Sequence, residues 1–232
     1  MNLLHSITLF TTMDALALAV WWLAWLAISL AIEYPPQRFP SVSHLMIGFR
    51  RDWMREMITR QPRLFDSSVL ASLRQGTTFF ASASMLAIGA GLALIGNTER
   101  LLGLAQDLTL ETAPAVVWEI KILIVLLFVT NAFLKFVWSH RLFGYCAVVM
   151  AAVPNDPDHP KALPRSVQAA ELNINAARSF NRGMRSLYFA IGGLSWLLGA
   201  APLIVATAVT FFVLWRREFG SGSRQALIGT PH

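Results

Sequence analysis

Four long apolar stretches constrain the fold of this chain more than any other feature. They are residues 15–32, 77–95, 118–138 and 187–214. A helix needs roughly 20 mostly apolar residues to cross the hydrocarbon core of a bilayer. Only 14% of the residues are charged, against roughly 25% in soluble domains. We therefore predict an all-α, polytopic membrane helix bundle with four transmembrane helices.

The ends of the first two stretches carry helix signals. Thr11, Thr12 and Asp14 suit the capped N-terminus of a helix, whose partial positive charge favours an acidic residue. No Lys or Arg precedes the first stretch, so we expect a retained span and not a cleavable signal peptide. Gly96-Asn97 predicts the end of the second helix.

The third stretch is bracketed by two tryptophans, as in an interfacial aromatic belt. Trp118 and Trp138 are 20 residues apart, which is about 30 Å along a helix. Lys121 and Lys135 fall just inside them, and we expect both ammonium groups to reach the headgroups.

The fourth stretch has 28 residues, more than one crossing needs. It must tilt, kink or fold back, and Pro202 is the expected place for a bend. A single kinked span puts Arg216 and Arg217 opposite the basic loops, whereas a re-entrant hairpin returns the tail to their side. We favour the single span, because the few tail charges are outnumbered by those of the loops.

Positive charges predict the orientation, since Lys and Arg that flank spans stay in the cytoplasm. We call residues 33–76 loop one and residues 139–186 loop three, and expect both to be cytoplasmic. The N-terminus and residues 96–119 then lie on the other side. The basic residues are Arg38, Arg50, Arg51, Arg55, Arg60, Arg63 and Arg74 in loop one, and Arg141, Lys161, Arg165, Arg178, Arg182 and Arg185 in loop three.

Loop one contains an amphipathic helix over residues 43–60, by the spacing of its apolar residues. Pro62 ends this helix, and Asp66 is expected to cap the helix that follows. The apolar face consists of Val42, Met46, Phe49, Trp53 and Met57, and the opposite face of His44, Gly48, Arg51, Arg55 and Thr59.

Loop three opens with a turn-rich run, residues 154–160, and continues as a second amphipathic cytoplasmic helix. Ser166 is its expected cap, and the helix runs into the fourth stretch. One stripe of this helix carries Glu171, Asn175, Arg178, Arg182 and Arg185, and another face carries Val167, Ala170, Ile174, Ala177 and Met184.

The residues that metals, cofactors and catalysis require are scattered. The histidines form no pair at metal-ligand spacing, and His44 and His140 are poorly placed to hold haem. Cys146 is expected to be a small apolar filler. We therefore predict no metal, cofactor or catalytic residue, and no enzyme. An enzyme would need titratable residues of separate helices to converge, for example Asp66, Lys135 and Arg185.

Two polar residues at membrane depth suggest a different role. Asn131 and Lys135 lie near the inner end of the third stretch, where polar groups often mark a transport path. The alternative, which we favour, is that Asn131 hydrogen-bonds a neighbouring helix and Lys135 reaches the interface.

An ordered set of motifs resembles a bacterial and plant integral-membrane family, the domain of unknown function 599. The resemblance extends from the first span to Phe219 and implies a four-span inner-membrane protein of a bacterium with no established activity. The motifs are Arg50-Arg51-Asp52-Trp53-Met54, Asp66, Thr78-Phe79-Phe80-Ala81-Ser82, Trp118-Glu119-Ile120-Lys121, Lys135-Phe136-Val137-Trp138-Ser139 with Arg141, Asn181-Arg182-Gly183-Met184-Arg185 with Tyr188-Phe189-Ala190, and Arg216-Arg217-Glu218-Phe219.

Together these features predict a non-enzymatic membrane protein whose basic cytoplasmic face binds anionic lipid or a partner protein. Residues 1–219 form a single domain in this prediction, and residues 220–232 a flexible polar tail. The alternative is a small homo-oligomeric transporter or channel that uses Asn131 and Lys135. Nucleic acid is not an expected partner, because topology accounts for the net charge of +6. The predicted lipid- or partner-binding residues are Arg50, Arg51, Arg55, Arg178, Arg182 and Arg185.

Overall fold

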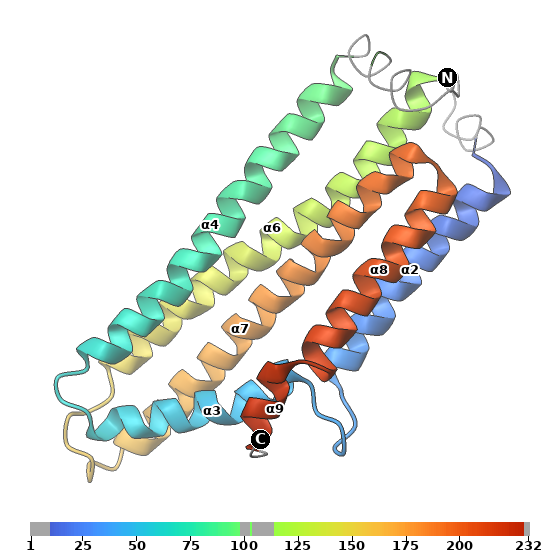
Figure 1. Cartoon of the computed structure of the whole chain (residues 1–232). Coiled ribbons are helices and arrows are strands. Elements are labelled where there is room, and N and C mark those ends of the chain that lie inside the picture. Colours follow the sequence, from blue (N-terminus) through green and yellow to red (C-terminus); the bar gives the residue numbers. More distant parts are fainter. Residues whose placement is uncertain (1–9, 98–102, 104–113, 230–232) are drawn as a thin grey trace. The chain divides into compact units, whose positions relative to one another are not determined.

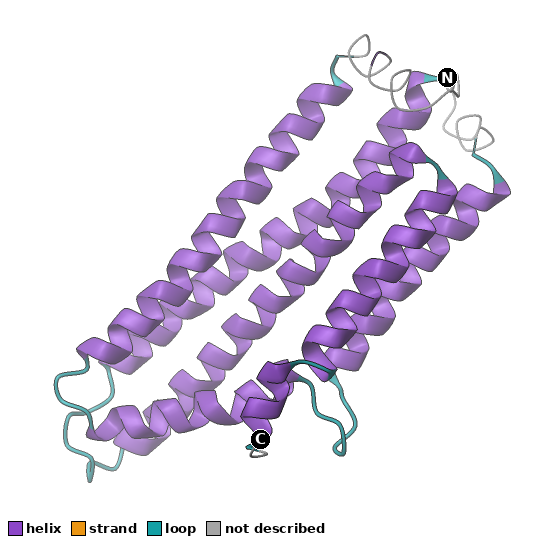
Figure 2. Cartoon of the chain, viewed as in Figure 1, coloured by secondary structure: helices purple, strands orange, loops and turns teal. Residues whose placement is uncertain are grey.

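The computed structural model describes residues 10–97, 103 and 114–229, and their regular structure is helical (Figures 1 and 2). The predicted all-α fold is therefore confirmed. In chain order the elements are α2 (Thr12–Glu33), α3 (Val42–Glu56), the 3-10 helix η1 (Met57–Thr59), α4 (Leu64–Ile95), α6 (Ala115–Ala151), α7 (Ala162–Gly193), the 3-10 helix η2 (Leu194–Leu198), α8 (Ala200–Phe219) and α9 (Gly222–Ile228).

Among the residues that the structure describes, four segments are long and apolar enough to cross a membrane: α2, α4, α6 and residues 200–228. The first three contain the predicted stretches. At the start of α2, the Thr11 N–H donates to Asp14 Oδ2 (3.2 Å) and the Asp14 N–H donates to Thr11 Oγ1 (3.1 Å). This reciprocal cap satisfies two N–H groups that the helix itself leaves free, as the sequence predicted.

The chain divides into two compact units, and α2, α4, α6, α7 and α8 contribute residues to both. Unit 1 comprises Met1–Ala31, Ala83–Ala132 and Met184–Arg216. Unit 2 comprises Ile32–Ser82, Phe133–Gly183 and Arg217–His232.

The fourth apolar stretch is not a single span, so that prediction was wrong. α7 ends at Gly193, and the chain turns at Gly199, whose φ of 122° is a conformation that side chains disfavour. Thr210 of α8 packs against Gly192, where an added Cβ would lie 2.9 Å from the threonine Oγ1. Ser195 Oγ lies 3.2 Å from the Pro202 carbonyl oxygen. α7 and α8 therefore form an antiparallel hairpin, and Pro202 sits in the first turn of α8, where proline is tolerated.

The hairpin places the tail against loop one, contrary to the single-span prediction. The Ser43 N–H of α3 donates to Glu218 Oε2 (2.9 Å). Arg224 Nε donates to the Pro40 carbonyl oxygen (2.9 Å), and its guanidinium carbon lies 4.2 Å from the ring centroid of Phe39. Arg224 belongs to α9, a helix within the segment expected to be a flexible tail.

Two residues expected to cap helices lie inside them instead. α7 begins at Ala162, and the buried Ser166 donates its hydroxyl to the Leu163 carbonyl oxygen (3.0 Å). α4 begins at Leu64, so that Asp66 lies within its first turn.

Lys121 turns into the protein, whereas we expected its ammonium group to reach lipid headgroups. Its side chain is buried, and its Nζ donates to the Trp196 carbonyl oxygen (3.0 Å). Trp118 is buried as well, and its ring centroid lies 5.5 Å from the same ammonium group. The pair therefore belongs to the interior of unit 1.

The core of unit 2 gathers side chains from α3, η1, α4, α6 and α7. Cys146 is fully buried within it, as expected of an apolar filler. Loops one and three meet beside this core: Gln61 Nε2 donates to the Asn155 carbonyl oxygen (2.7 Å), and Arg63 donates to that of Pro154 (2.8 Å). Loop one and loop three are thus in direct contact with each other.

Candidate functional site

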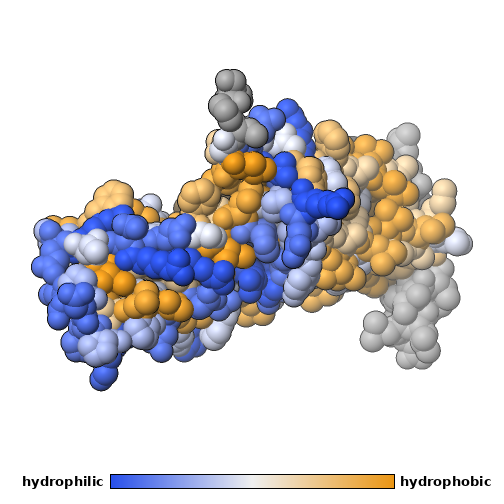
Figure 3. All heavy atoms as spheres, turned by 90° about the horizontal axis from the view of Figure 1, so that it is seen from below, coloured by the Kyte–Doolittle hydropathy of each residue, from blue (hydrophilic) through white to orange (hydrophobic). Residues whose placement is uncertain are grey.

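Charge is divided very unequally between the two units. Unit 2 contains 15 Lys and Arg against 8 Asp and Glu, whereas unit 1 contains 4 against 5. The net charge is thus +7 in unit 2 and −1 in unit 1, which together give the +6 of the chain. Seen from the end that carries α3 and α9, hydrophilic side chains form a broad band (Figure 3). Unit 2 therefore carries the positive charge that a site for anions requires.

Three of the six predicted arginines reach the surface. Arg51 pairs with Glu171 (2.9 Å), and Arg55 lies 3.9 Å from Asp52. Arg178 is exposed and donates to Asn175 Oδ1 (3.3 Å). The predicted polar face of the helix in loop one is confirmed, because all five of its residues are exposed: His44, Gly48, Arg51 and Arg55 of α3, and Thr59 of η1.

The other three predicted arginines turn inward. Arg50 donates to Asn173 Oδ1, and burial lowers the pKa of its guanidinium. Arg182 pairs with Glu33, and the hydrogen bond to this carboxylate raises the pKa of the arginine. Arg185 is 4% exposed, and its Nε donates to Ser29 Oγ (3.2 Å) in unit 1. These residues join helices; Arg185 is withdrawn from the surface, whereas the Arg182 side chain is still 42% exposed within its ion pair.

Asn131 and Lys135 fall in different units. Asn131 Nδ2 donates to Ser186 Oγ (2.7 Å), which joins α6 to α7. The favoured expectation that this amide bonds a neighbouring helix is confirmed. Lys135 is half-buried, and its carbonyl oxygen accepts the Ser179 hydroxyl (2.9 Å).

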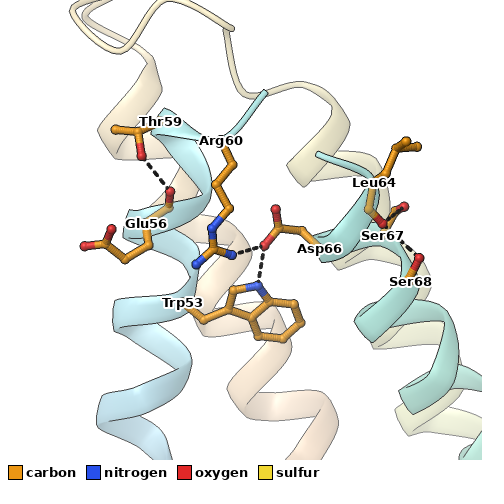
Figure 4. A network of polar contacts seen from close by, with 8 residues as sticks. All are labelled: Trp53, Glu56, Thr59, Arg60, Leu64, Asp66, Ser67 and Ser68. Atoms are coloured by element: carbon orange, nitrogen blue, oxygen red, sulfur yellow. Dashed lines mark hydrogen bonds and ion pairs between the residues drawn. The ribbon is translucent and has the colours of Figure 1, made fainter. Parts of the chain in front are cut away.

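Sequence reasoning missed a buried carboxylate, that of Asp66. Its Oδ1 accepts hydrogen bonds from Trp53 Nε1 (2.7 Å) and from Arg60 (2.6 Å) (Figure 4). Asp66 has no exposed surface, whereas the Arg60 side chain is 40% exposed. The three residues fasten α3 and the segment after η1 to the first turn of α4. In the sequence, an aspartate near a helix start resembles a helix cap. Only the folded structure shows that Trp53 and Arg60 are its hydrogen-bond donors.

Sequence reasoning also missed a cavity of about 860 Å³ in unit 2. Its walls come from η1, the start of α4 and the end of α6, together with residues of loops one and three. Two arginines, Arg63 and Arg74, line it among apolar side chains. Both were counted as loop charges, and nothing in their spacing indicates a shared cavity.

Comparison with known proteins identifies a family and no individual relative. The sequence profile of a family described as "Protein of unknown function, DUF599" matches residues 16–223. No curated protein and no solved structure matches the chain.

Proposed function

The chain belongs to the DUF599 family of proteins of unknown function. From this premise we propose that it is a multi-pass protein of a bacterial inner membrane. In this proposal unit 2 faces the cytoplasm and binds anionic lipid headgroups. The observation that carries the proposal is the charge difference between the units, +7 against −1. Basic residues beside spans are retained in the cytoplasm. Each Lys or Arg near an anionic leaflet contributes about 1 kcal/mol of attraction.

The exposed arginines of α3 and α7 are suited to this binding. Arg51 and Arg55 lie beside carboxylates, but exposed ion pairs contribute only about 0–1 kcal/mol. A lipid phosphate can therefore replace the carboxylate as the partner of the guanidinium, with which it forms charge-assisted hydrogen bonds. Among the described residues Arg178 forms no ion pair and donates to the neutral amide of Asn175, so phosphate binding there displaces no carboxylate.

The orientation gives a first prediction. Single cysteines in place of His44 and Ser223, both exposed, will react with a membrane-impermeant maleimide in inverted membrane vesicles and not in intact spheroplasts. The native Cys146 is buried and should add little background. The contacts of α9 with loop one require that both positions label from the same side. Labelling of both in intact spheroplasts would reverse the orientation and refute the proposal.

A second prediction concerns the surface arginines. Arg51→Gln with Arg55→Gln and Arg178→Gln should reduce the number of phosphatidylglycerol molecules retained by the purified protein in native mass spectrometry. Glu171→Gln should increase that number, because it frees Arg51 from its ion pair. Both changes in the number of retained lipids should be smaller in high salt, because salt screens the charges. With phosphatidylcholine in place of phosphatidylglycerol, neither variant should differ from the wild type.

Equal lipid counts in the wild type and both variants would contradict lipid binding at this surface. Co-purification of one acidic protein, lost in the triple variant while the lipid counts stay unchanged, would assign the arginines to a protein partner instead.

A further inference from the structure

We propose that the cavity in unit 2 binds a single-chain amphipathic anion, with the charged head at Arg63 and Arg74 and the alkyl chain along α4 and α6. This inference concerns a defined, partly open site and does not depend on the surface proposal. Arg51, Arg55 and Arg178 do not line the cavity.

The cavity has an unbalanced positive charge. Arg63 donates to the carbonyl oxygens of Val153 (2.7 Å) and Pro154 (2.8 Å), and Arg74 lies 3.3 Å from the His140 ring. Within the described parts of the chain, no carboxylate lies within 4.0 Å of either guanidinium, and no lining residue is acidic. Both arginines also keep a buried Nε for which the described residues supply no hydrogen-bond partner. An anion would neutralise this charge and accept hydrogen bonds that the protein leaves unmade.

The rest of the wall is suited to a hydrocarbon chain. Leu70 and Ala71 of α4 face the cavity, as do Ala147, Met150 and Ala151 of α6. The small alanine side chains leave room between the helices. Leu64 and Arg74, which both line the cavity, are ten residues apart, or about 15 Å along α4.

The size of the cavity limits the ligand. Its volume of about 860 Å³ lies within the range of roughly 300–1,000 Å³ that is usual for small-molecule sites. This space suits one alkyl chain with a compact head. A long-chain carboxylate and a lysophospholipid with an anionic head share this chemistry.

The test uses the whole protein in amphipol, because detergent would compete for the cavity. Oleate and lyso-phosphatidylglycerol are the two anionic probes, lysophosphatidylcholine is the zwitterionic probe, and inorganic phosphate lacks the chain. Native mass spectrometry should show one molecule of an anionic probe per chain at low micromolar concentration. The tighter binder of the two anions, oleate or lyso-phosphatidylglycerol, identifies the preferred head group. Inorganic phosphate alone should not displace either probe.

Protein variants distinguish recognition of the ligand's charged head from recognition of its alkyl chain. Arg74→Gln should weaken binding about tenfold, as the loss of a charge-assisted hydrogen bond predicts. Ala147→Phe should weaken binding, because the ring occupies part of the space expected to hold the alkyl chain. Val148→Phe is the matched control, because Val148 is 69% exposed and does not line the cavity. Arg51→Gln is the charge control, and neither control should change the affinity.

A photo-crosslink on the wild type keeps the proposal testable if a variant fails to fold. A fatty acid that carries a diazirine should label peptides from residues 64–74 and 147–155. Equal binding of lysophosphatidylcholine, unchanged binding in Ala147→Phe, or labelling confined to other peptides would overturn the proposal.

Discussion

Arg60→Ala will lower the free energy of unfolding by about 3 kcal/mol, the lower end of the range for breaking a buried ion pair. The substitution leaves Asp66 as a fully buried carboxylate with Trp53 as its remaining hydrogen-bond donor in the network. We take the lower end because the Arg60 side chain is 40% exposed and already partly hydrated. Thermal unfolding of the purified protein, followed by circular dichroism, measures the effect.

A second substitution identifies the cause. Asp66→Asn on the Arg60→Ala background should restore part of the lost stability, because the amide oxygen can still accept from Trp53 and no buried charge remains. Loss of packing by the arginine stem would not be repaired in this way. A double variant no more stable than Arg60→Ala alone would therefore contradict the electrostatic explanation.

Gly183→Ala will destabilise unit 2 by about 1–3 kcal/mol, the usual cost of overpacking. An added Cβ would lie 2.7 Å from Phe136 Cε1, closer than side chains tolerate. The Phe136 ring is fully buried, and its centroid lies 5.5 Å from those of Phe80 and Phe180, so it has little room to move. Thermal unfolding again measures the change.

Gly144→Ala is the matched control, since nothing lies within 4 Å of its added Cβ. Both substitutions raise helix propensity, by about 0.5–1 kcal/mol. Gly144→Ala should therefore be neutral or stabilising while Gly183→Ala destabilises. Similar changes in the two variants would show that the close packing of α7 on Phe136 contributes little.

The sequence predicts the parts of this fold that depend on length and period. Apolar runs locate α2, α4 and α6, and a three-and-four spacing locates α3 and its exposed face. The hairpin at Gly199 was an alternative that such reasoning could not select, because 28 apolar residues are compatible with one long span or with two arms. The first arm of the hairpin is the end of α7, which begins as an amphipathic helix. The apolar part of α7 is too short to be recognised from the sequence as a span of its own.

The candidate site was harder to predict, because it depends on contacts between distant residues. Arg50 and Arg51 are neighbours in the sequence, yet one helix step of about 100° turns Arg50 toward Asn173 and leaves Arg51 exposed. Asn173 is 123 positions away from Arg50. In the same way, Arg63 and Arg74 come to line one cavity only after α6 packs beside α4.

The contacts between α3 and the segment after α8 also affect the order of events during synthesis. Ser43 and its acceptor Glu218 are separated by 175 positions. At a translation rate of about 5–20 residues per second, Ser43 is made roughly 10 to 35 seconds before Glu218. Until then the first turn of α3 lacks one of its acceptors, and the Phe39 ring lacks its stacking partners Phe219 and Arg224. Loop one can thus make its full set of contacts only after the final hairpin has been synthesised, so that the last residues of the chain complete a surface begun by its first third.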